Sequence, residues 1–154
     1  MLVPHFGSIS TEILRKGIFN VIENTGFAGR WQILSRIPLT VCDTGHNESG
    51  IKEVLYQISQ TPHENLHFVF GMVNDKEIET ILRILPKDAT YYFCNADIPR
   101  GLDASELRKQ AQRYGLKGDA FDSVKIALKA AQQHATVNDL VFVGGSTFVV
   151  AEVV

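Results

Sequence analysis

The sequence contains little cysteine, and its two thiols, Cys42 and Cys94, lie far apart within apolar runs. Two thiols without a short spacing indicate neither a zinc site nor a framework of disulfides. We therefore interpret both as small buried hydrophobic side chains. The five histidines are scattered along the chain and show no metal-ligand spacing. The sequence thus predicts no metal site within this chain.

Charge of one sign is also lacking, because 15 Lys and Arg residues are balanced by 17 Asp and Glu residues, for a net charge of -2. This balance gives no overall basic surface for nucleic acid or an anionic membrane, although it leaves room for a local basic site. No run reaches the roughly 18 apolar residues of a membrane-spanning helix. The start, MLVPHFGSIS, lacks the pattern of a secretory signal. We therefore expect a cytoplasmic protein without nucleic-acid or membrane partners.

Familiar catalytic motifs are missing as well. The chain has no G-x-x-x-x-G-K-[ST] phosphate loop, no G-x-G-x-x-G fingerprint and no H-E-x-x-H zinc motif. Ser146 follows two glycines, but the segment GGSTF does not complete the G-x-S-x-G elbow of a serine hydrolase, and no base lies near it in sequence. A helix cap or a polar ligand contact is therefore favoured for Ser146 over a nucleophile, and the sequence identifies no catalytic residue.

What the chain does contain is enough apolar sequence for one ordinary domain, with 154 residues of which 45% are hydrophobic. Apolar runs typical of buried strands alternate with segments whose apolar residues recur every three or four positions, as in helices. A loop is expected around the glycines at 115 and 118, and both helix and strand stay open for the tail, 148–154. We expect helices at 11–25, 48–60, 75–85, 104–114 and 123–134, and strands at 31–34, 39–42, 66–70, 90–94 and 140–143.

This alternation predicts an α/β fold, a three-layer, Rossmann-like, mostly parallel sheet with helices on both faces. The two short strands at 31–34 and 39–42 are expected to form a hairpin or a bent edge. Ligands of such sheets bind beyond the carboxyl ends of the strands. The candidate site residues therefore belong to the segments that follow strands, which are 43–47, 71–76, 95–100 and 144–147.

The densest polar cluster is Asp43-Thr44-Gly45-His46-Asn47. The carboxylate of Asp43, at the end of a strand, could accept both hydroxyls of a ribose, with His46 and Asn47 directed into the same crevice. The N-terminus of the next helix would favour an anionic ligand there. A purely structural role is the alternative, because Asn47 or Ser49 could cap that helix.

Two arginines are candidates for an anionic ligand. Arg30 precedes the first strand and could clamp a phosphate in bidentate fashion. Arg100 follows a buried strand and could bind a carboxylate. Each could equally be a solvated surface residue. Asp75, which follows Gly71, could cap the next helix.

Taken in order, these segments resemble a known family. Gly29-Arg30 followed by D-T-G-H-N at 43–47 resembles the G-R and D-G-A-H-N signature of folylpolyglutamate synthase/dihydrofolate synthase, in the C-terminal domain of that Mur-ligase-type enzyme. Phe70-Gly71 with Asp75-Lys76, Pro99-Arg100 before a helix, and G-G-S at 144–146 resemble the later motifs of the same domain.

The resemblance covers residues 26–154 and implies a Mur ligase C-terminal domain fold. Residues 1–25 resemble the end of the central domain, a helix that leads into the hinge. The chain departs from the family pattern at Ala28, Thr44, Gly45 and Glu48, whereas the Asp, His and Asn of the signature are kept.

The resemblance also implies a reaction. The family attaches L-glutamate to a folate or dihydropteroate carboxylate, using ATP and magnesium, through an acyl phosphate and with release of ADP. Its phosphate loop and magnesium ligands lie in an N-terminal ATPase domain that this chain lacks, which implies a partner domain and no activity alone. The implied ATP contacts are Arg30, Asp43, His46 and Asn47, sharing one crevice, and the implied glutamate contacts are Arg100 and Ser146.

Three alternatives stay open. A peptidoglycan-precursor (Mur) amino-acid ligase has a similar C-terminal domain, although D-x-x-H-N at 43–47 favours the folate branch. A stand-alone nucleotide-binding module would have no catalysis. A small flavodoxin-like enzyme would need a phosphate-cradling loop after its first strand, and the sequence has none there.

Overall fold

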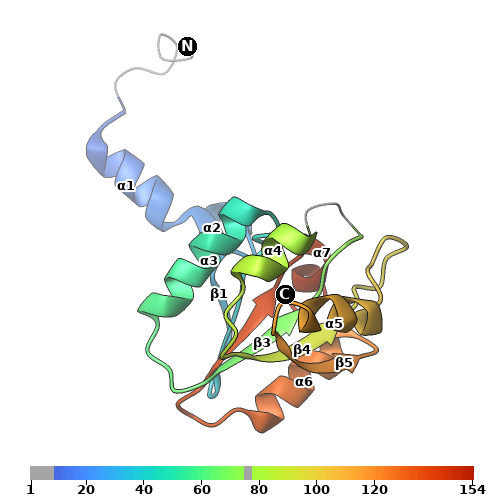
Figure 1. Cartoon of the computed structure of the whole chain (residues 1–154). Coiled ribbons are helices and arrows are strands. Elements are labelled where there is room, and N and C mark those ends of the chain that lie inside the picture. Colours follow the sequence, from blue (N-terminus) through green and yellow to red (C-terminus); the bar gives the residue numbers. More distant parts are fainter. Residues whose placement is uncertain (1–8, 75–77) are drawn as a thin grey trace.

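A computed structural model describes residues 9–74 and 78–154 of the chain. Figure 1 shows a twisted sheet with helices on both sides, and one helix near the N-terminus that projects away from this body. None of the helices within the described residues is long and apolar enough to cross a bilayer.

The six-stranded sheet has the order β1-β2-β6-β3-β4-β5. Its first two strands form an antiparallel hairpin, and all other neighbours pair in parallel, which confirms the predicted mostly parallel α/β sheet. The strands are β1 (Gln32–Arg36), β2 (Leu39–Cys42), β3 (Leu66–Phe70), β4 (Thr90–Cys94), β5 (Lys117–Phe121) and β6 (Leu140–Gly144).

Seven helices are present among the described residues. Two of them precede the sheet, and the others follow strands. They are α1 (Thr11–Phe19), α2 (Val21–Thr25), α3 (Glu48–Gln60), α4 (Ile78–Ile84), α5 (Ala104–Gln112), α6 (Val124–His134) and α7 (Thr147–Ala151).

The two faces of the sheet carry different side chains because neighbouring residues of a strand point to opposite sides. In β3, Phe68 and Phe70 pack with α3, α4 and α5, whereas Val69 packs with α6 and α7. The first face is aromatic, since the ring of Phe68 stacks 5.5 Å from that of Tyr91 and meets that of Phe142 at 4.9 Å. Small residues on the other face allow α6 to lie close to the sheet.

The insertion of β6 between β2 and β3 gathers the carboxyl ends of these three strands at one edge. The connections through α3, α4 and α5 cover one face, and the return through α6 covers the other. Loops that are far apart in sequence therefore meet where β2, β6 and β3 end. Ligands of parallel sheets bind at such a point.

Two predicted elements were wrong. The helix expected at 11–25 is interrupted at Asn20, which ends α1 and begins α2 with φ -100° and ψ 17°. The loop expected around Gly115 and Gly118 contains β5, a short, polar edge strand that has no continuous apolar run to reveal it. A side chain at Gly118 would collide with the carbonyl group of Tyr91 on β4. The expected cap at Asp75 lies outside the described residues.

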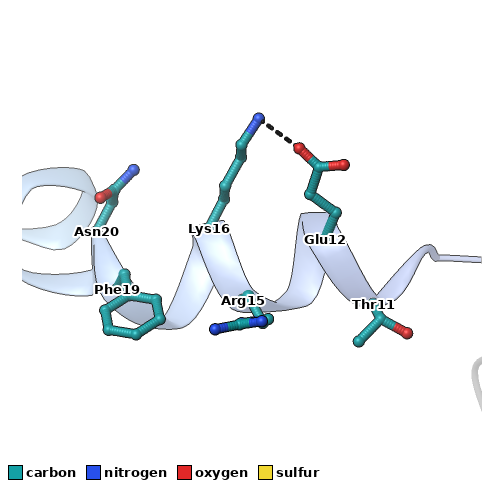
Figure 2. A pocket seen from close by; sticks show the side chains of 6 residues that line it. All are labelled: Thr11, Glu12, Arg15, Lys16, Phe19 and Asn20. Atoms are coloured by element: carbon teal, nitrogen blue, oxygen red, sulfur yellow. Dashed lines mark ion pairs between the residues drawn. The ribbon is translucent and has the colours of Figure 1, made fainter.

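The helix α1 stands apart from the core, and no residue of α1 or α2 is buried. Figure 2 shows the surface of α1, with an ion pair of 3.0 Å between Lys16 and Glu12 and with Arg15 and Phe19 on another side of the helix. Apolar side chains are nevertheless frequent here, and Ile18 and Phe19 are 71% and 77% exposed. The segment contributes no packing to the sheet.

Removing residues 1–25 should therefore leave the melting temperature within about 2 °C, the scale of a surface change. Thermal unfolding followed by circular dichroism measures this. Removal of residues 147–154 is the matched control and should abolish cooperative unfolding, because Val149 and Val150 of α7 are buried in the core. A loss of cooperativity on removing residues 1–25 would contradict this assignment.

A buried polar network closes the opposite, amino-terminal edge of the sheet. Asp139 accepts hydrogen bonds from the main-chain nitrogens of Thr136 (2.7 Å) and Asn65 (3.0 Å). His67 places Nε2 3.5 Å from Asp139 Oδ2 and Nδ1 3.0 Å from the hydroxyl oxygen of Tyr92. The hydrogen bonds from Thr136 hold the pKa of Asp139 well below its usual range, and burial lowers the pKa of His67.

Both pKa shifts predict a loss of stability in acid, because unfolding frees His67 and Asp139 to bind protons that the folded state disfavours. The free energy of unfolding should fall as the pH drops below about 6.5, where unfolded His67 gains its proton, and again below about 4, where unfolded Asp139 does. Each group contributes no more than about 1.4 kcal/mol per pH unit.

Denaturant titrations across this pH range measure the effect. The variant His67→Gln should lack the first decline, whereas the control His46→Gln should keep it, because His46 is exposed. An unchanged pH profile in His67→Gln would show that another group is responsible.

Candidate functional site

The buried carboxylate of Asp43 connects the loop after β2 to the turn before β1. Its side chain is 6% exposed, Oδ2 accepts a hydrogen bond of 2.8 Å from the Trp31 nitrogen, and Oδ1 accepts one of 2.8 Å from the Gly45 nitrogen. The guanidinium of Arg30, 54% exposed, lies 3.4 Å from Oδ1. The carboxylate thus fixes two loops and leaves the cationic end of Arg30 accessible.

The turn before β1 adopts a conformation that ordinary residues disfavour. Gly29 has φ 80°, and a side chain there would approach Thr44 Cγ2 within 2.9 Å, so the position requires glycine. Trp31 has φ 41°, which costs free energy for a residue with a side chain. The hydrogen bond from Trp31 to Asp43 and the packing of its ring 6.1 Å from that of Phe142 hold this conformation.

The next residues of the loop begin α3. Asn47 Oδ1 accepts a hydrogen bond of 2.8 Å from the Gly50 nitrogen, which confirms the predicted cap and leaves the Asn47 amide nitrogen available to a ligand. His46 is exposed, and its Nδ1 lies 3.0 Å from the carbonyl oxygen of Thr44. The loop therefore presents one amide and one imidazole beside the end of β2.

The segment after β6 forms a neighbouring wall. Gly145 has φ 95° and packs against the ring of Phe70, where a side chain would have no room. Ser146 is 3% exposed, and its hydroxyl accepts a hydrogen bond of 3.2 Å from the Phe148 nitrogen. This is a helix cap, one of the two roles predicted for Ser146, and the hydroxyl hydrogen is still free to donate.

The loops after β3 and β4 are joined to each other. Val73 and Gly101 form an antiparallel bridge, and the Leu102 nitrogen donates a hydrogen bond of 2.9 Å to the Met72 carbonyl. The Asn74 nitrogen donates one of 3.0 Å to the carbonyl of Arg100. These bonds place Arg100 beside the end of β3, although it comes from the loop after β4.

These loops surround a cleft of about 490 Å³. Arg100 is the one fully charged side chain among the described lining residues, and Met72, Val73 and Phe148 give the cleft an apolar side. Such a lining suits an anionic ligand with an aliphatic part. The complete described lining is His46, Asn47, Met72, Val73, Arg100, Gly145, Ser146, Thr147 and Phe148.

The structure divides the predicted site residues into two groups. His46, Asn47, Arg100 and Ser146 line the cleft together, whereas the Arg30–Asp43 pair does not belong to its lining. The sequence predicted one crevice for Arg30, Asp43 and His46; Arg30 and Asp43 lie 3.4 Å apart, and His46 follows Asp43 by three residues in the same loop.

The apolar side of the cleft is not marked by any motif in the sequence. Met72, Val73, Thr147 and Phe148 were not named as ligand contacts, and the one available signal was their position just after buried strands. Among residues 9–74 and 78–154, no group of three His, Cys, Asp or Glu side chains could hold a metal ion.

The sequence of this chain is similar to that of a known enzyme family. The family model described as "Mur ligase, glutamate ligase domain" matches residues 29–147. A relative from Haloferax volcanii, a probable bifunctional folylpolyglutamate synthase/dihydropteroate synthase, is 32% identical over 147 residues. The match covers 94% of this chain and 17% of the relative.

Solved structures agree with this match. E. coli FolC in complex with DHPP and ADP superimposes with a TM-score of 0.84 at 31% identity, over 96% of this chain and 34% of that one. A bifunctional folylpolyglutamate synthase/dihydrofolate synthase with Mn, AMPPNP and L-glutamate bound gives a TM-score of 0.81 at 28% identity, over 96% of this chain and 35% of that one. The chain therefore spans about a third or less of the length of these proteins.

Replacing Asp43 by Ala should lower the free energy of unfolding by about 1–3 kcal/mol, because two main-chain donors lose their buried acceptor. Urea titration measures the change, with Asp97→Ala as the control, since Asp97 is exposed. Equal stabilities of the two variants would show that Asp43 does not hold the loops together.

Proposed function

This chain belongs to the Mur ligase family through its glutamate ligase domain, and we propose that it is the C-terminal domain of an ATP-dependent folylpolyglutamate synthase/dihydrofolate synthase. The observation that carries the proposal is the cleft, in which Arg100, Asn47 and Ser146 converge at the carboxyl ends of the strands. Similarity over 94–96% of the chain to proteins named as dihydrofolate synthase/folylpolyglutamate synthase supports it.

The proposed reaction joins L-glutamate to the carboxylate of a folate or of dihydropteroate. ATP first converts that carboxylate into an acyl phosphate, and the amino group of glutamate then displaces phosphate, so ADP and phosphate are released. A structural neighbour with Mn, AMPPNP and L-glutamate bound supports this set of ligands. The neighbours are about three times as long as the chain, so a preceding ATPase domain is expected to supply the phosphate loop and the metal ligands.

In this proposal the Arg30–Asp43 pair faces the nucleotide. The half-exposed guanidinium of Arg30 can bind a phosphate oxygen or a ribose hydroxyl. Asp43 acts mainly by positioning Arg30 and the loop at 43–47, because both of its oxygens already accept main-chain hydrogen bonds. A direct contact between Asp43 and the ribose stays a prediction.

The cleft takes the glutamate in this proposal. Arg100 supplies a guanidinium for a carboxylate, and the amide nitrogen of Asn47 and the hydroxyl of Ser146 supply two further donors. Met72, Val73 and Phe148 would contact aliphatic carbons. The contacts of His46 and Asn47 with ATP, predicted from sequence, are thereby replaced with contacts at the amino-acid end.

The first 25 residues have a separate role in the proposal, as the connection to the preceding domain. No apolar side chain of α1 or α2 is buried, and a neighbouring domain would cover them. The relevant side chains include Ile13, Leu14, Ile18, Phe19 and Ile22, all of which are exposed.

The alternatives have less support. The relatives and neighbours described above are named as folate enzymes, which favours the folate branch over a peptidoglycan-precursor ligase. A non-catalytic nucleotide-binding module would bind nucleotide without the preceding domain. Under the main proposal this domain forms only part of the nucleotide site, so by itself it is expected to bind nucleotide weakly.

The 154-residue chain alone should show no turnover with ATP, magnesium, L-glutamate and dihydropteroate. The same chain joined to a preceding ATPase domain of the family should form ADP in proportion to the glutamate ligated. Coupled measurement of ADP release tests both statements. Turnover by the isolated chain would refute the proposal.

Replacing Arg100 by Gln in the joined enzyme should raise the KM for glutamate by about 10- to 100-fold, the value of one charge-assisted hydrogen-bond pair. The KM for ATP should change little. Arg36→Gln is the matched control, because Arg36 lies at the far end of the β1–β2 hairpin. An unchanged KM for glutamate in Arg100→Gln would place the amino acid elsewhere.

A further inference from the structure

The imidazole of His46 is held in one tautomer by its own loop. Its Nδ1 lies 3.0 Å from the carbonyl oxygen of Thr44. A carbonyl oxygen can only accept a hydrogen bond, so Nδ1 must carry the hydrogen. In the neutral ring, Nε2 is therefore unprotonated and has a lone pair, and it is the nitrogen left for a ligand in the cleft.

The other polar groups of the cleft mainly donate. Arg100 has only donors, and the oxygens of Asn47 and Ser146 already accept hydrogen bonds from the main chain. The hydroxyl of Thr147 can accept a hydrogen bond but is not a base. Within the described part of the lining, His46 is the one side chain with a ring nitrogen that can accept a proton. The charged groups near it on the described elements are Arg100, which lines the same cleft, Glu48, which pairs with Lys52 on α3, and Asp43, which pairs with Arg30.

We propose that Nε2 of His46 accepts the proton that the amino group of the incoming amino acid must lose before it attacks. The inference rests on the proposed function, since it requires an amine ligand in the cleft. It assigns His46 to the acceptor amine, where the sequence had suggested a nucleotide contact.

The step balances in atoms and charge. The ammonium group of the amino acid gives one proton to His46 Nε2 and becomes a neutral amine. The nitrogen lone pair forms a bond to the carbonyl carbon of the acyl phosphate, and the bond between that carbon and the phosphate oxygen breaks. The second proton leaves the nitrogen with the phosphate, which departs as hydrogen phosphate, and the imidazolium returns its proton to water.

The first test uses the chain itself, with 15N-labelled histidine observed by NMR. His46 should show the Nδ1–H tautomer, and L-glutamate should shift its Nε2 resonance. Glutarate, which has the same two carboxylates without an amine, should bind with a much smaller shift of Nε2. His63 is an internal control, because its Nδ1 contacts the Thr61 carbonyl in the same way at 2.6 Å but at the opposite edge of the sheet.

An Nε2–H tautomer at His46, no response to millimolar glutamate, or equal responses to glutamate and glutarate would overturn the proposal. These outcomes do not depend on ligase activity. If His46 responds as expected but the joined enzyme ligates another amino acid, the proposed function fails and the role of His46 stands.

The second test is kinetic and uses the chain joined to its ATPase domain. His46→Ala should lower kcat by about 100-fold or more, as expected for loss of a proton acceptor. Added imidazole should restore part of the rate, and the decline of the rate toward acid should disappear in the variant. His63→Ala should keep the wild-type rate and profile. A raised KM for ATP with an unchanged pH profile would instead assign His46 to the nucleotide.

Discussion

One buried carboxylate holds together the edge of the sheet on which the site depends. Asp43 accepts main-chain hydrogen bonds from Trp31, before β1, and from Gly45, before α3, and it also pairs with Arg30. Without it, two main-chain donors would lose their buried acceptor, and the unfavourable backbone conformation of Trp31 would lose a direct support. The position of His46 and Asn47 follows from this arrangement, because they continue the same loop.

Strand order provides the second part of the site. Because β6 lies between β2 and β3, the loop at 43–47 meets the segment at 145–148 and the one at 72–74. The bridge between Val73 and Gly101 then brings in Arg100 from the loop after β4. A cleft with donors on several sides is thus assembled from four segments, none of which forms a recognisable ligand-binding motif alone.

The sequence was sufficient for the parts whose signal is local. Continuous apolar runs predicted β3, β4 and β6, and the amide of Asn47 predicted the start of α3. β5 was missed because a polar edge strand buries too little to show a periodic pattern. The meeting of Met72 and Phe148 in one cleft could not be predicted, since it depends on which strands are neighbours.

If Asp43 holds this edge of the sheet together, the main-chain amides that donate to it are protected from solvent. Hydrogen exchange of the Trp31 and Gly45 amides tests it most directly, because both amides lie outside regular strands and helices but donate to the buried carboxylate. We expect protection comparable to that of the Asp43 amide, which continues the β2–β6 ladder by bonding to the Val143 carbonyl. Exchange of either amide as fast as in exposed loops would contradict it.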